Sequence, residues 1–173
     1  LGQGGSDTLD GGDGADLIDG STGNDTIRGG DGTDVVTGGD GDDSIEAGNG
    51  SDNVDAGLGN DTVMAGNGED TLDGGAGNDF LNGDGGADTV LGNNGDDRIL
   101  GGELNDNLQG GDGNDNIDGQ AGNDQITGEA GNDTLAGGVG NDNLFGNDGD
   151  DVINAQAGND SVTGGNGDDS ILG

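Results

Sequence analysis

The stretch Gly110–Asp118 reads GGDGNDNID and decides the fold, because near copies of it fill the whole chain. An Asp recurs every nine residues without a slip, from Asp7 to Asp169, which gives nineteen units. Two residues after each Asp stands Leu, Ile or Val, and two residues before it stands Gly, except at Leu104. No insertion or linker interrupts the period. We therefore expect a repeat array that forms a single domain over residues 1–173.

The composition limits the classes of partner. The chain has 47 Gly, a net charge of -36 and no Lys, His or Cys, so only Arg28 and Arg98 could meet a phosphate. Nucleic acid is excluded on these grounds, and no apolar stretch is long enough for a membrane span. Multivalent cations are the obvious partner. The chain begins with Leu1 and has no signal peptide, so we expect a piece of a longer protein.

The two halves of the unit predict different local structures. Glycine adopts positive φ at no steric cost, so the Gly-rich half predicts a turn. The other half, such as Asn116-Ile117-Asp118, predicts a three-residue strand whose middle side chain alone points inward. The simplest closed coil is turn, strand, turn, strand. The sequence thus predicts an all-β, parallel β-roll (a β-solenoid) with two nonapeptides per 18-residue coil. It would have about 9.5 coils and be roughly 45 Å long at ~4.8 Å per coil.

Such a roll has a thin aliphatic core and stacks like charges on one another. Calcium removes this conflict, because it takes six to eight oxygen ligands from carboxylates and carbonyls. One stack of turns has nine gaps and the other has eight, so up to about 17 ions could bind and make folding depend on the metal. Magnesium demands tighter geometry, and zinc or iron would want His or Cys. The predicted ligands are Asp7, Asp16, Asp25, Asp34, Asp43, Asp52, Asp61, Asp70, Asp79, Asp88, Asp97, Asp106, Asp115, Asp124, Asp133, Asp142, Asp151, Asp160 and Asp169, which we call the phased Asp residues.

The unit G-G-x-G-x-D-x-U-x, with U aliphatic, resembles the RTX (hemolysin-type) calcium-binding repeat over the whole chain. The resemblance implies a right-handed parallel β-roll with Ca²⁺ held between turns by Asp carboxylates and main-chain carbonyls. It also implies a secreted or cell-surface bacterial protein. Such proteins are exported unfolded by a type I secretion apparatus and fold outside in millimolar calcium. The expected partners are calcium, the secretion apparatus during export and flanking domains of the parent chain.

Other functions fit the sequence less well. An EF-hand would need a closing Glu and flanking helices, and catalysis would need a position that differs from its eighteen equivalents. We therefore expect no enzyme in this segment, although a separate part of the parent protein could carry one. Two alternatives stay open. The first is a calcium-locked adhesin or surface-layer rod. The second is an ice-binding face along the Asn and Asp residues that precede half of the phased Asp, although the matching Thr rank holds only Thr22.

A few positions depart from the pattern. Leu104 stands where positive φ is expected, so we predict a strained turn and a distorted ion site beside Asp106. Phe80 and Phe145 fall on outward strand positions, where they are candidate contacts with a flanking domain. The second glycine of the unit is replaced eight times, and these side chains should point outward. The eight residues are Gln3, Ser21, Asp84, Asn93, Gln120, Glu129, Asn147 and Gln156.

Overall fold

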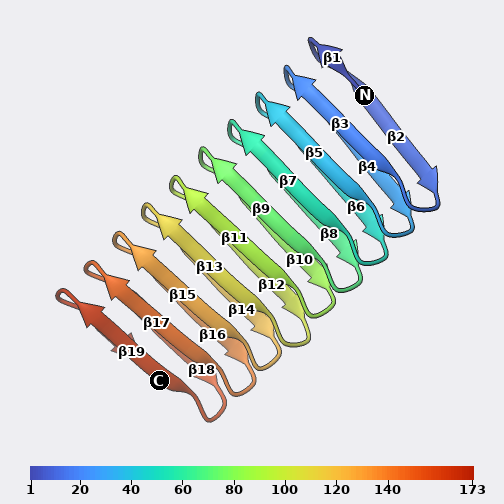
Figure 1. The fold of residues 1–173 in the computed structure, drawn as a ribbon. Coiled ribbons are helices and arrows are strands. Elements are labelled where there is room, and N and C mark those ends of the chain that lie inside the picture. Colours follow the sequence, from blue (N-terminus) through green and yellow to red (C-terminus); the bar gives the residue numbers. More distant parts are fainter.

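The computed structural model describes all residues 1–173 and consists of strands and turns. Twenty strands alternate between two ten-stranded sheets, one of odd-numbered and one of even-numbered strands. All neighbours pair in parallel with a register of 18 residues, as Ile99 with Ile117. Figure 1 shows the two sheets as the faces of one flattened coil that advances by one strand of each sheet per turn. The predicted β-roll with two nonapeptides per coil is confirmed. No helix that could cross a membrane is found.

The strands follow the repeat closely. The odd sheet contains β1 (Gln3–Gly4), β3 (Leu17–Thr22), β5 (Val35–Asp40), β7 (Asn53–Leu58), β9 (Thr71–Ala76), β11 (Thr89–Asn94), β13 (Asn107–Asp112), β15 (Gln125–Ala130), β17 (Asn143–Asp148) and β19 (Ser161–Asn166). The even sheet contains β2 (Thr8–Asp13), β4 (Thr26–Asp31), β6 (Ser44–Asn49), β8 (Thr62–Asn67), β10 (Phe80–Gly85), β12 (Arg98–Glu103), β14 (Asn116–Ala121), β16 (Thr134–Val139), β18 (Val152–Ala157) and β20 (Ser170–Leu172).

The prediction of three-residue strands was wrong, because the interior strands have six residues. The first half of the glycine segment continues the strand and pairs with the next coil, as Gly111 does with Glu129. Only three residues, Gly-x-Asp, remain for each turn. A strand of six is better suited to a stack than a strand of three, because each coil then forms more ladder hydrogen bonds.

Two positions of each six-residue strand face the interior, not one. The second residue is the aliphatic of the unit, and the fourth is Gly or Ala, since alternate residues face the same side. The buried core accordingly contains 20 residues, sixteen aliphatics and four alanines, and Leu9 and Val162 pack against it. The alanines are Ala47, Ala56, Ala65 and Ala155. The core is one layer thick and runs the length of the roll, and Ile171 in the last coil is 49% exposed.

The turns line up along two edges of the roll. The first edge contains the turns that lead from the odd to the even sheet, such as 113–115, and lies at the upper left of Figure 1. The second edge contains the return turns, such as 104–106. Leu104 has φ 76°, so the predicted positive φ at this position is confirmed. The replaced second glycines, Gln3 excepted, also have positive φ, between 62° for Asp84 and 83° for Glu129.

Candidate metal centre

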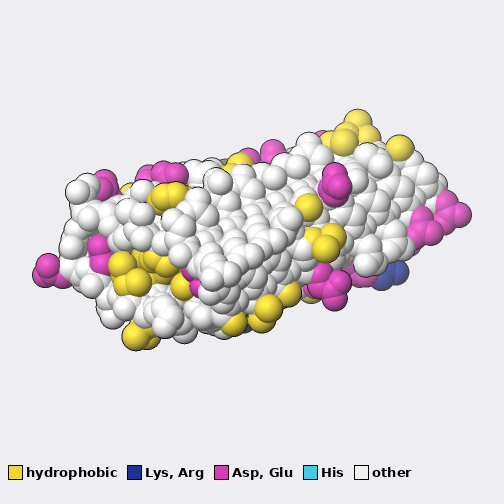
Figure 2. Space-filling view, turned by 90° about the horizontal axis from the view of Figure 1, so that it is seen from below, with side chains coloured by type: hydrophobic (Ala, Val, Ile, Leu, Met, Phe, Trp, Pro, Cys, Tyr) yellow, Lys and Arg dark blue, Asp and Glu magenta, His cyan; other side chains and the backbone are white.

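The phased Asp residues close the turns and form two rows, one along each edge. The first row runs from Asp7 to Asp169 and the second from Asp16 to Asp160. Fifteen of the nineteen, from Asp25 to Asp151, are buried with at most 3% of their surface exposed. The face in Figure 2 accordingly shows Asp and Glu only as scattered groups, although the chain carries 38 acidic residues. The fold therefore encloses most of the phased carboxylates.

One carboxylate oxygen of each phased Asp from Asp25 to Asp169 binds the preceding coil. Asp115 Oδ1 accepts a hydrogen bond of 2.8 Å from the main-chain N–H of Asp97, and the same bond recurs in every gap of both rows. Seventeen such bonds of 2.7–3.1 Å join successive coils. We call this bond the carboxylate clamp. It fixes the register of the turns, because it joins equivalent residues 18 positions apart.

The second oxygen has no partner. Oδ2 of sixteen phased Asp residues, from Asp16 to Asp151, is buried and accepts no hydrogen bond. It points toward the first glycine of its own unit. A Cβ added to Gly119 would lie 2.5 Å from Asp124 Oδ2 and 2.6 Å from the carbonyl oxygen of Gly137. A buried polar atom without a partner is costly, and a charged one is more so.

The pKa values report the same uncompensated charge. Burial raises the pKa of Asp79, Asp106 and Asp115 to about 7, with a smaller contribution from neighbouring phased carboxylates. The clamp N–H acts in the opposite direction and only partly offsets burial. The rows therefore lack a positive charge, and neither Arg28 nor Arg98 can supply one, because both side chains lie on the outer face of the even sheet.

Comparison with known families decides the identity. The sequence model of the RTX calcium-binding nonapeptide repeat, which spans four copies, matches residues 1–36, 28–63, 64–99, 100–135 and 136–171. The chain belongs to this RTX repeat family. No curated protein matches the chain in sequence. Because RTX nonapeptides bind calcium, the two Asp rows of this RTX roll can be tested as calcium sites on their own geometry.

The donor set of the rows fits Ca²⁺. Calcium is a hard cation that prefers carboxylate and carbonyl oxygens, and the rows present unpartnered carboxylate oxygens next to main-chain carbonyls. No group of three or more acidic side chains converges at one point, so an ion would need carbonyl ligands as well. Asp Oδ2 and carbonyls such as that of Gly137 would hold the ion in this RTX roll. When bound, calcium supplies the positive charge that the buried carboxylates lack.

The turn at Leu104 departs from the regular main-chain hydrogen bonding of the other turns. The first residue of other turns donates its N–H to the next coil, with distances of 2.6–2.9 Å in regular turns. The N–H of Leu104 makes no such bond, and those of Gly86 and Gly122, one coil before and after, lengthen to 3.3 and 3.0 Å. The clamp of Asp106 on Asp88 keeps 2.8 Å. The distortion therefore affects the main chain of the turn, and its effect on ion binding beside Asp106 stays a prediction.

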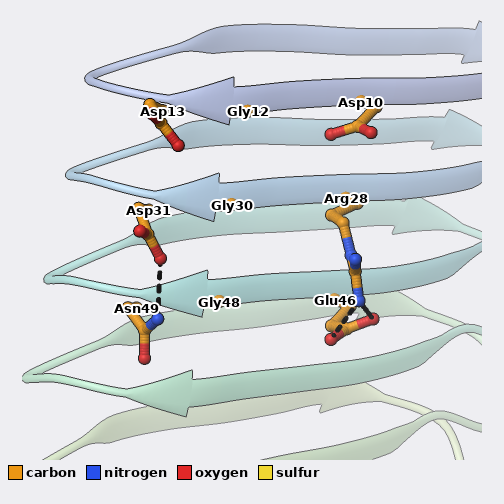
Figure 3. A pocket seen from close by; sticks show the side chains of 9 residues that line it. All are labelled: Asp10, Gly12, Asp13, Arg28, Gly30, Asp31, Glu46, Gly48 and Asn49. Atoms are coloured by element: carbon orange, nitrogen blue, oxygen red, sulfur yellow. Dashed lines mark hydrogen bonds and ion pairs between the residues drawn. The ribbon is translucent and has the colours of Figure 1, made fainter.

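The surface hollows of the roll lie apart from the rows. All three are on the outer face of the even sheet, and none is lined by a phased Asp. Figure 3 shows the first, with a volume of about 340 Å³, between the columns Asp10–Arg28–Glu46 and Asp13–Asp31–Asn49. Arg28 donates to Glu46 at 2.8 Å there, and both side chains are more than half exposed. This hollow is a polar surface trough over glycines.

Sequence reasoning identified the phased Asp residues but not the separate tasks of their oxygens. The nine-residue period shows that a carboxylate recurs, whereas the clamp depends on how the turn places that carboxylate against the coil before it. The sequence reasoning also overlooked that the first glycine of the unit faces the interior. The four alanines there were the available signal, because Ala is the one substitution at that position.

Proposed function

We propose that this chain is the calcium-binding module of a secreted bacterial RTX protein, unfolded without Ca²⁺ and folded when the two Asp rows fill outside the cell. The observation that carries the proposal is the set of sixteen buried Oδ2 atoms without a partner. All nineteen phased Asp residues are the proposed ligands, with up to about 17 ions, one for each gap. Extracellular calcium modules typically bind at about 10⁻⁴–10⁻³ M, which would leave the chain unfolded in the cytosol.

The role of the folded roll is structural and coupled to export. Folding on calcium binding would occur after passage through a type I secretion apparatus, and the folded roll would then support the flanking domains of its parent protein. The alternative is a stiff, calcium-locked rod in an adhesin or surface layer, favoured by the unbroken regularity of both sheets. The sequence on either side decides between them. A catalytic or toxin domain favours the first role, and further adhesin repeats favour the second.

The test is a calcium titration followed by far-ultraviolet circular dichroism, with magnesium as the control ion. We expect a disordered spectrum in chelator, a cooperative gain of sheet signal with calcium, reversal by chelator and little response to magnesium. A compact sheet spectrum that persists unchanged in chelator would refute the proposal, because the rows would then need no cation.

A further inference from the structure

A second ladder of hydrogen bonds runs along the first edge, one residue before the phased Asp. Asn or Asp occupies this position in the first row from Asn24 to Asp168. From Asp42 onward, Oδ1 of each residue accepts the main-chain N–H of its equivalent in the next coil. Seven consecutive bonds of 2.7–2.9 Å result. We call this the Asx ladder.

The second edge has this ladder only in its C-terminal half. Asn123, Asn141 and Asn159 each donate their N–H to the Asn one coil earlier, at 2.7–3.0 Å, and the series starts at Asn105. In the preceding coils the same position holds Ala15, Thr33, Ser51, Glu69 and Ala87, and no side chain accepts the N–H of the next coil. The ladder bond is therefore missing from the second edge as far as the turn of Asp106, and on the first edge only from the turns of Asp7, Asp25 and Asp43.

The carboxylate clamp and the Asx ladder bind a turn to the coils on its opposite sides. The carboxylate clamp ties the N–H of the phased Asp to the coil ahead, as Asp115 does with Asp133. The Asx ladder ties the adjacent N–H to the coil behind, as Asn114 does with Asp96. Turns with both bonds are fixed in two directions. Turns with the clamp alone keep freedom in the peptide unit next to the carboxylate, and they must lose that freedom when the turn is ordered around an ion.

We propose that the Asx ladder positions the turns for calcium, so that the turns without a ladder bond fill last and open first. Beyond Asp43, all of these turns lie on the second edge, up to Asp106. The roll is then graded and not uniform, because the turns without a ladder bond lie between Asp7 and Asp106. This inference rests on the proposed calcium function and adds to it the order in which the sites respond. The residues of the ladder act as positioning residues, since their Oδ1 atoms are bonded to the main chain.

The test is hydrogen exchange by mass spectrometry over a calcium series, read at the N–H groups of the phased Asp. These N–H groups carry the clamp bond at both edges, so they report the opening of equivalent turns. At limiting calcium, peptides with Asp34, Asp52 and Asp70 should exchange faster than peptides with Asp61, Asp79 and Asp97. Equal protection of the two sets would overturn the proposal. No response to calcium in either set would overturn it together with the proposed function.

Two substitutions test the cause. Ala87→Asn places an acceptor one coil before Asn105 and should slow exchange in the turn 104–106 roughly fivefold, as expected for one added hydrogen bond. Ala87→Gln is the matched control, because it adds the same amide one methylene farther out and should leave the rate unchanged. In the opposite direction, Asn132→Ala removes the acceptor of the Asp150 N–H and should speed exchange at Asp151 by a similar factor. Equal effects of Ala87→Asn and Ala87→Gln, or no effect of Asn132→Ala, would refute the ladder as the cause.

Discussion

The separate roles of the two carboxylate oxygens of a phased Asp, Oδ1 in the clamp and Oδ2 as the proposed calcium ligand, can be measured at Asp115. This residue lies in the middle of the first row, is 2% exposed, and binds the Asp97 N–H through Oδ1 while Oδ2 is unpartnered. Asp115→Asn keeps an Oδ1 acceptor for the clamp but loses the anionic ligand. Asp115→Ala loses both. The structure therefore predicts an order of stability in calcium: wild type, then Asn, then Ala.

The magnitudes follow from the two interactions. At about 10 mM calcium, one site with a Kd of 10⁻⁴–10⁻³ M contributes ~1.4–2.7 kcal/mol, which is the expected cost of Asp115→Asn. Alanine leaves the buried Asp97 N–H unpaired for a further ~1–3 kcal/mol. With an m-value of about 2 kcal/mol/M, urea midpoints should fall by ~0.7–1.4 M for Asn and by a further ~0.5–1.5 M for Ala.

The assay must be urea unfolding at fixed calcium, not the calcium midpoint. If about 17 ions bind together, a loss of 2 kcal/mol shifts the calcium midpoint only ~1.2-fold, because the change is shared over all the ions. Asp112→Asn is the control, since it removes one exposed carboxylate that makes no hydrogen bond, and should change little. Equal midpoints for Asn and Ala would refute the clamp, and a wild-type midpoint for Asn would refute Oδ2 as a ligand.

Three further results are expected. Leu108→Ala removes a fully buried core side chain and should lower the free energy of unfolding by about 2–5 kcal/mol, measured in urea. Ile171→Ala changes the equivalent but half-exposed position and should lower it much less. Similar losses for the two variants would contradict the single-layer core. Leu104→Gly removes the backbone strain of a non-glycine residue at φ 76° and loses only a side chain that is 62% exposed, so it should raise the free energy of unfolding by about 1 kcal/mol. Val139→Gly changes a similarly exposed residue without positive φ and should lower it. A loss of stability in both variants would show that the turn is unstrained. The calcium-loaded roll should show no thermal hysteresis in an ice-growth assay, because the Asx oxygens of the first edge are already bonded to the main chain; measurable activity would favour the ice-binding alternative.

The coil could be predicted from the sequence because its determinants are strictly local and repeated. An aliphatic such as Ile117 every nine residues can be buried on one side only if two units close a coil. The length of the strands could not be predicted, because glycine carries no strand propensity and Gly110–Asp112 reads as a turn. The neighbouring coils decide this segment: once they supply ladder partners, the glycines pair as strand residues.

The candidate site, too, could be predicted only in part. The ligand-type residues could be read from the period, but the use of each oxygen depends on where a turn places its carboxylate, which no pattern of residue types records. The Asx ladder is intermediate. Its residues form a visible rank from Asn24 to Asp168, but a preference of Asx for Gly-rich turns is enough to explain that rank without any bond between coils. Only the register of 18 residues shows that each side chain reaches the next N–H.

The charge of the phased position is the strongest argument that the rows serve a cation. An Asn there could form the clamp through its Oδ1, and it would avoid the cost of burying a carboxylate. The residue just before it serves an equivalent ladder with Asn and Asp interchangeably, as at Asn60 and Asp96. The phased position nevertheless holds Asp in all nineteen units and never Asn. Hydrogen bonding alone would permit either residue at both positions, so the negative charge is what distinguishes the phased position. A cation such as Ca²⁺ between the coils would make that charge favourable.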